Sequence, residues 1–158
     1  MLYLLQPIMQ IQINAMTVKL ENPLGDNLEI SDATSKFNLK FNKKAMLPMY
    51  VPFEISYSGA SLDETHLTIS YFNQKTNQIM IIHVFPSAND NLKGSVSTSE
   101  KEIKLTDGTK AVYYHYPNEV ADRIHFIKDG LEYRIGLSKT SNKVSVSTLV
   151  MVADSLRK

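Results

Sequence analysis

The stretch IHFIKDGLEYRIGL, Ile124–Leu137, decides the fold, because it holds two alternating runs joined by Asp129-Gly130. Asp-Gly between alternating runs is typical of a two-residue β-hairpin turn, in which both positions take positive φ. The apolar positions of the returning run share one face of the strand: Leu131, Tyr133, Ile135 and Leu137. Glu132 and Arg134 take the opposite face. This strand is therefore predicted to face the core on one side and a polar environment on the other.

Two more hairpins extend this pattern toward the N-terminus. Glu100–Leu105 and Lys110–Tyr116 flank a turn at Thr106–Thr109 that also contains Asp-Gly. Leu67–Phe72 alternates and is followed, after a polar linker, by the nearly all-apolar run Gln78–Phe85. The Ile and Val content of that run predicts a strand inside the sheet.

The first fifty residues show weaker signals. Alternation over residues 10–21 predicts half-buried strands, and the cluster at 22–26 predicts a turn. Ser31 is a candidate cap for a short helix that reaches about Phe37.

A proline-containing segment follows, Met46–Phe53. Its prolines at positions 48 and 52 restrict the backbone twice, which predicts a stiff, extended, apolar crossing that Ile55 and Tyr57 continue as a strand.

The C-terminal segment Val144–Leu156 is ambiguous by propensity. Its four valines favour a strand, whereas the spacing of Leu149, Val152, Ala153 and Leu156 is helical. We interpret it as a helix, partly on the family resemblance given below.

These patterns predict one α+β domain over residues 1–158. Its core would be a twisted antiparallel sheet of about six or seven strands. The C-terminal helix and the short helix near residues 31–37 are expected to pack on one face of that sheet.

The composition excludes several classes of function. The chain has 158 residues, no cysteine and a net charge of +1. Disulfide, thiolate and iron–sulfur chemistry are therefore absent, and no broad positive field favours nucleic acid as a partner. Residues 1–16 lack a basic start and are interrupted by polar residues, so they do not fit a signal peptide. No run is long enough for a membrane span, and we expect membrane attachment only through an anchor outside this chain.

No motif for catalysis, a metal or a cofactor is present. The four histidines lack metal-ligand spacing, no G-x-S-x-G occurs, and the six glycines do not form a phosphate loop. We therefore expect a protein that is not an enzyme and has no cofactor. An enzymatic alternative would require His115, His125 and a carboxylate to converge in one cleft.

Aromatic side chains are the candidate binding residues. Tyr71, Tyr113 and Tyr133 could line a pocket between sheet and helix. Tyr50 and Phe53, on the extended crossing, and the loop Ser87–Ser99 are candidate contact surfaces for a protein partner.

Taken in order, several segments resemble the DUF4367-type domain of Bacillus and related bacteria. The similar segments are Leu47–Phe53, Leu67–Phe72, Ile79–Pro86, Lys104–Ala111 with Tyr113-Tyr114, Asp129–Tyr133 and Leu149–Leu156. The resemblance covers roughly residues 28–157. Phe126 stands near a position where the family often has tryptophan, and the lipobox cysteine of the lipoprotein members is absent.

This resemblance implies a setting that the residues alone do not. Such domains occur in small lipoproteins and in the extracytoplasmic part of anti-sigma-like proteins, and their shape is similar to the PsbP/Mog1-like sandwich. It implies a non-catalytic extracytoplasmic module that binds an envelope protein or senses the state of the envelope. The alternative is a small-molecule or lipid binder that uses the aromatic pocket.

Overall fold

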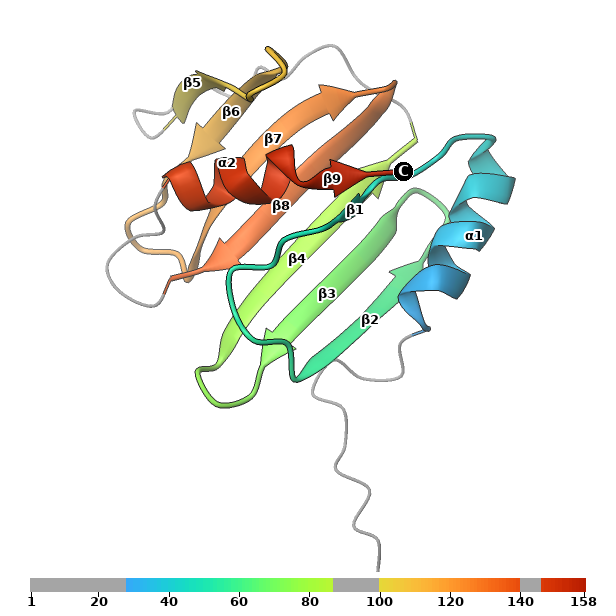
Figure 1. Cartoon of the computed structure of the whole chain (residues 1–158), viewed down its shortest axis with the longest axis horizontal. Coiled ribbons are helices and arrows are strands. Elements are labelled where there is room, and N and C mark those ends of the chain that lie inside the picture. Colours follow the sequence, from blue (N-terminus) through green and yellow to red (C-terminus); the bar gives the residue numbers. More distant parts are fainter. Residues whose placement is uncertain (1–27, 87–99, 140–145) are drawn as a thin grey trace, which may run out of the picture.

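Seven antiparallel strands form the main sheet in the computed structural model, which describes residues 28–86, 100–139 and 146–158 (Figure 1). The strands are β2 (Tyr57–Leu62), β3 (Leu67–Asn73), β4 (Gln78–Phe85), β5 (Glu100–Lys104), β6 (Lys110–Tyr114), β7 (Ala121–Lys128) and β8 (Leu131–Ser138). Their spatial order is β2-β3-β4-β8-β7-β6-β5. The predicted α+β class, with its antiparallel sheet, is confirmed.

The three predicted hairpins are confirmed with their turns. Asp129 and Gly130 have φ values of 52° and 72°, as a two-residue turn between β7 and β8 requires. Gly108 has φ of 86° in the β5–β6 turn. Strand β4 lies inside the sheet between β3 and β8, as its apolar composition predicted.

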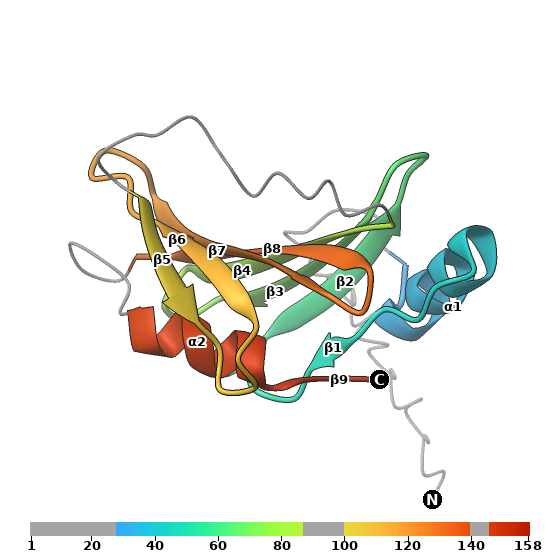
Figure 2. The same ribbon diagram turned by 90° about the horizontal axis from the view of Figure 1, so that it is seen from above.

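One face of the sheet is covered by the other elements. Helix α2 (Val146–Asp154) and the two-stranded ribbon of β1 (Leu47–Pro48) and β9 (Leu156–Arg157) lie on the same side of the sheet (Figure 2). Helix α1 (Ile30–Phe41) packs beside β2 and β3. We call this side the covered face; its buried side chains include Met80, Ile82, Val84, Ile124, Phe126, Leu131, Tyr133, Ile135 and Leu137.

The opposite side is the open face. Side chains there alternate with those of the core and are only partly buried on β3, β4 and β7. The alternation predicted for β8 is confirmed, since Leu131, Tyr133, Ile135 and Leu137 are buried and Arg134 is exposed. Neither α1 nor α2, the helices of the described residues, has the length and apolar character that crossing a lipid bilayer requires.

The first helix differs from its prediction at both ends. It starts at Ile30 with Glu29 at the N-cap position and no side-chain capping bond, so the assignment of Ser31 as the cap was wrong. It continues past Phe37 to Phe41, because these rings pack with centroids 4.9 Å apart. Asn42, in the left-handed conformation with φ of 50°, ends the helix.

The extended crossing is only briefly a strand. Within Met46–Phe53, Leu47–Pro48 alone pairs with another strand. Ile55 precedes β2 and is 46% exposed, so its assignment to a strand was wrong. The C-terminal segment is helical in α2, and Leu156 then pairs in β9. The predicted strands at 10–21, the turn at 22–26 and the loop at 87–99 lie outside the described residues.

Tyr133 connects the sheet to the crossing. Its side chain is fully buried, and its Oη accepts a hydrogen bond of 3.0 Å from the backbone N–H of Met46. The ring also stacks on Phe126, with centroids 5.3 Å apart. Burial raises the pKa of Tyr133 to about 12, so the phenol stays protonated.

Tyr133→Phe keeps the ring and removes the acceptor of the Met46 N–H. We expect it to lower the free energy of unfolding by about 1–3 kcal/mol, the cost of a buried unsatisfied donor. Tyr57→Phe is the matched control, since its hydroxyl contacts Gln74 at 3.4 Å on the surface. Urea unfolding of both variants checks this, and equal losses would contradict the role assigned to Tyr133.

Candidate functional site: a groove on the open face

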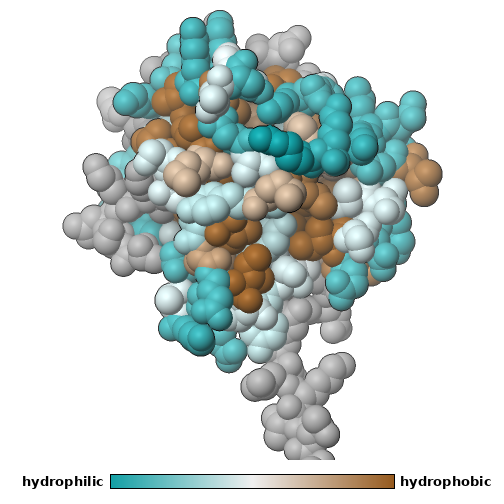
Figure 3. All heavy atoms as spheres, in the orientation of Figure 1, coloured by the Kyte–Doolittle hydropathy of each residue, from teal (hydrophilic) through white to brown (hydrophobic). Residues whose placement is uncertain are grey.

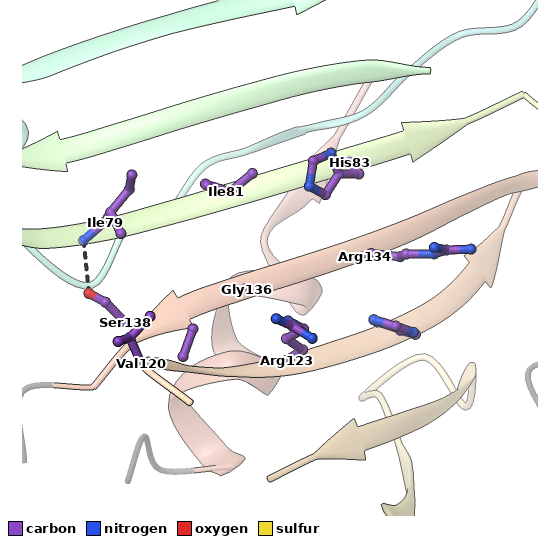
Figure 4. Close-up of a pocket in the computed structure, with 10 residues that line it drawn as sticks. Ile79, Ile81, His83, Val120, Arg123, Arg134, Gly136 and Ser138 are labelled. Carbon is purple, nitrogen blue, oxygen red and sulfur yellow. Dashed lines mark hydrogen bonds between the residues drawn. The ribbon is translucent and has the colours of Figure 1, made fainter. Parts of the chain in front are cut away.

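A groove of about 400 Å³ lies on the open face over β4, β8 and β7 (Figure 4). Most of its lining side chains form three cross-strand rows, each with one residue from each strand. In order along the strands, the rows are His83–Arg134–His125, Ile81–Gly136–Arg123 and Ile79–Ser138–Ala121. We call them the histidine row, the glycine row and the apolar row; Val120 also lines the groove, and it is 83% exposed.

The antiparallel register creates these rows. Arg134 of β8 is opposite His83 of β4 and also opposite His125 of β7. Two residues further along β8, Gly136 is opposite Ile81 and Arg123. Alternation then places all of these side chains on the face opposite the core.

Gly136 makes the middle of the groove hollow. A Cβ atom at this position would meet only the Cγ of Arg123 at 3.8 Å and the carbonyl oxygen of Ile81 at 4.0 Å. Both distances are ordinary contacts, so the backbone here would accept a side chain. The missing side chain leaves the floor of the groove open between Ile81 and Arg123.

Arg134 lies between the two histidines of its row. Its Nε donates to Glu132 at 2.6 Å, and its guanidinium lies 4.4 Å from the ring centroid of Phe85. The Nδ1 of His83 is 3.0 Å from the hydroxyl of Thr68. Figure 4 shows the side chain of Arg134 running along β8 beside His83.

Both histidines of the row favour their neutral form. Burial, followed by the charges of Arg134 and Arg123, lowers the pKa of His125 to about 4. Burial is also the main cause of the lowered pKa of His83, followed by His66 and then by the same two arginines. At neutral pH the positive charge of the groove therefore comes from its arginines.

Arg123 supplies the second charge. Its Nη2 contacts a carboxylate oxygen of Glu119 at 2.7 Å, and its side chain is 44% exposed. The guanidinium also lies 5.4 Å from the ring centroid of Tyr116. A guanidinium has five N–H donors, so one ion pair does not use its full capacity for hydrogen bonds.

A second histidine cluster adjoins the histidine row. The ring of His66 stacks on Phe85 at 4.7 Å and meets the ring of His83 at 5.2 Å. Its Nδ1 lies 3.1 Å from Asp63, whose pKa is lowered to about 2, mainly by the backbone N–H groups of Thr65 and His66. Within residues 28–86, 100–139 and 146–158, no three potential ligands gather for a metal ion.

The buried carboxylate of Asp122 belongs to the other side of the sheet. It is fully buried, accepts from the Oη of Tyr113 at 3.0 Å, and lies 2.9 Å from the Nδ1 of His115 and 3.5 Å from the Nζ of Lys139. His115 thus contacts a residue of the covered face, whereas His125 lines the open face. The two histidines named in the enzymatic alternative do not form one cleft.

The aromatic residues predicted as binding residues lie elsewhere. Tyr71, Tyr113 and Tyr133 are 7%, 6% and 0% exposed and belong to the core cluster. Phe53 packs partly buried against that core, and Tyr50 is 37% exposed beside α2. None of the five lines the groove.

Sequence reasoning missed the groove because its residues come from three strands. One signal was available: Gly136 interrupts an alternating strand, and a glycine there often marks a close approach or a hollow. The pairing of β4 with β8, which brings His83 to Arg134, has no local signal.

Histidines with a low pKa make stability depend on pH. The unfolded chain takes up a proton at His125 near pH 6.5, whereas the folded chain does so only near pH 4. Between these values the unfolded state binds more protons, so acid favours it. We expect the free energy of unfolding to fall by about 2 kcal/mol between pH 7 and pH 4.5.

His125→Gln should remove most of this decrease in urea titrations at the two pH values. Asp107→Asn is the control, since Lys128 lowers the pKa of that carboxyl below its ordinary 3.8 and its effect lies at lower pH. If wild type and His125→Gln lose equal stability, His125 is not the group responsible.

No family model matches the chain, and no curated protein or solved structure is significantly similar to it. The resemblance to the DUF4367-type domain therefore stays a prediction. A function for the chain must be inferred from the geometry of the groove.

Proposed function

We propose that the protein is a non-catalytic binding module that holds a small amphiphilic molecule in the groove of the open face. The observation that carries this proposal is that the lining side chains change from polar to mostly apolar along the groove. Arginines and neutral histidines line one end, and Ile79, Ala121 and Val120 line the other. An amphiphile would satisfy both ends at once.

The size and lining fit such a role. Pockets for small molecules commonly measure about 300–1,000 Å³ and combine an apolar lining with a few polar groups. The groove, at about 400 Å³, lies in the lower part of this range. The proposed site is thus on the face of the sheet opposite the aromatic pocket expected from the sequence.

The arrangement favours binding over catalysis. The hydroxyl among the lining side chains belongs to Ser138, whose Oγ accepts from the backbone N–H of Ile79 at 2.8 Å. It lies four residues along β8 from the histidine row, about 13 Å at the rise of a strand. The serine and the histidines therefore do not form a nucleophile–base pair.

The resemblance supports an extracytoplasmic setting for this module, with a lipoprotein or anti-sigma-like context and an envelope protein as partner. One observation favours a protein contact as a second function. Met49 and Met151 are 76% and 53% exposed, and both adjoin Ser155 through backbone hydrogen bonds. Hydrophobic surface is visible on this covered face in Figure 3.

Gly136→Val tests the groove directly. The side chain fills the hollow, so we expect the affinity for a neutral apolar fluorescent probe such as Nile red to fall by about tenfold or more. Thermal stability should stay equal or rise, because valine suits a strand better than glycine. Fluorescence titration and thermal unfolding measure the two effects.

Ser70→Val is the matched control. Ser70 is on the open face opposite Ile81, in the same cross-strand line as Gly136, but it does not line the groove. Probe binding should be unchanged in this variant. Equal probe binding by wild type and Gly136→Val would refute the proposed site.

A further inference from the structure

We infer that the ligand of this groove is a single-chain aliphatic carboxylate, with its carboxylate at the end lined by Arg134 and Arg123 and its chain along Ile81 and Ile79. This inference rests on the proposed function and specifies the chemistry of the ligand. It follows from the charged side chains of the groove, its length and its volume.

The polar end of the groove is lined by two arginines. Arg134 and Arg123 are in adjacent rows on neighbouring strands, two residues apart along the strand direction. Both have a glutamate partner, yet both still lower the pKa values of His83 and His125. Each guanidinium has five N–H donors, so donors beyond those in the two ion pairs are available for an anionic head group.

The donors suit a planar anion. A guanidinium offers a rigid fork of N–H groups that matches a carboxylate, and the contact with Glu132 uses the Nε of Arg134. Neutral imidazoles at His83 and His125 can donate or accept, depending on the tautomer. Burial of part of this end reduces competition from water and strengthens each bond.

The length of the groove determines how long the alkyl chain of the ligand can be. The distance from the histidine row to the apolar row is four residues along each strand, or about 13 Å. An extended chain of about ten or eleven carbon atoms, with the carboxyl carbon included, covers this distance. The groove has a volume of about 400 Å³, and Ile79, Ile81 and Val120 give its other end an apolar lining for the chain.

Calorimetric titration of the whole chain at pH 7.5 tests the head group. The ligands are decanoate, decanol, decylamine and acetate, all below the concentrations at which they aggregate. We expect decanoate to bind about tenfold more tightly than decanol, decylamine more weakly still, and acetate not measurably. Added salt should weaken decanoate binding and leave decanol unaffected.

Arg134→Met and Arg123→Met test the placement of the carboxylate. Each should reduce decanoate affinity by about tenfold and leave decanol affinity nearly unchanged. Lys101→Met is the charge-matched control, since Lys101 is exposed on the edge strand β5. This substitution should change the affinity for neither decanoate nor decanol. Thermal unfolding confirms that each variant is folded.

The outcomes separate the two proposals. If decanol binds as tightly as decanoate, and Gly136→Val abolishes both, the groove binds amphiphiles but the inference of a carboxylate is overturned. Tight binding of acetate, or decanoate binding that is equal in wild type and both arginine variants, overturns it as well. If Gly136→Val changes the binding of neither Nile red nor decanoate, the proposed function itself is refuted, and the inference of a carboxylate ligand in this groove is refuted with it.

Discussion

Strand β8 is hydrogen-bonded on both sides, and its register with β4 and β7 is the constraint on which both faces of the sheet depend. The same pairing that places Ile135 between Ile82 and Ile124 in the core places Gly136 between Ile81 and Arg123 on the open face. A shift by one residue would exchange the two sets and place Arg134 in the core. Burial of the apolar side chains on the covered face therefore also fixes the positions of the groove residues on the open face.

The covered face shows why the other face stays open. Two helices and one short ribbon bury the apolar side of the sheet, and Tyr133 joins that side to the crossing through the N–H of Met46. The described helices and ribbon lie on or beside that apolar side, where covering side chains gains hydrophobic free energy. The residues that alternate with them along the strands face the open side and include arginine and histidine, whose burial would cost free energy.

The groove holds its charge at a cost in stability. Burial, and then the charges of two nearby guanidinium groups, lower the pKa of both histidines, and the guanidinium groups are ion-paired with Glu132 and Glu119. Glycine at position 136 adds a further cost, since the strand would accept a side chain there. Features that reduce stability and together form a hollow are typical of a binding site.

Local physical chemistry determined the hairpins, the alternation of β8 and the α+β class, because turn geometry and strand periodicity are encoded within a few residues. The same local rules failed at both ends of α1. Glu29 and not Ser31 precedes the helix, and the helix runs past Phe37 to Phe41, whose ring packs on that of Phe37. The local rules also led to tyrosines as binding residues, although those rings are large apolar groups that the core buries. The Asp129-Gly130 hairpin already pairs His125 with Arg134. Only the tertiary structure brought His83 to them, because the pairing of β4 with β8 joins positions more than forty residues apart in sequence and is set by packing across the whole sheet.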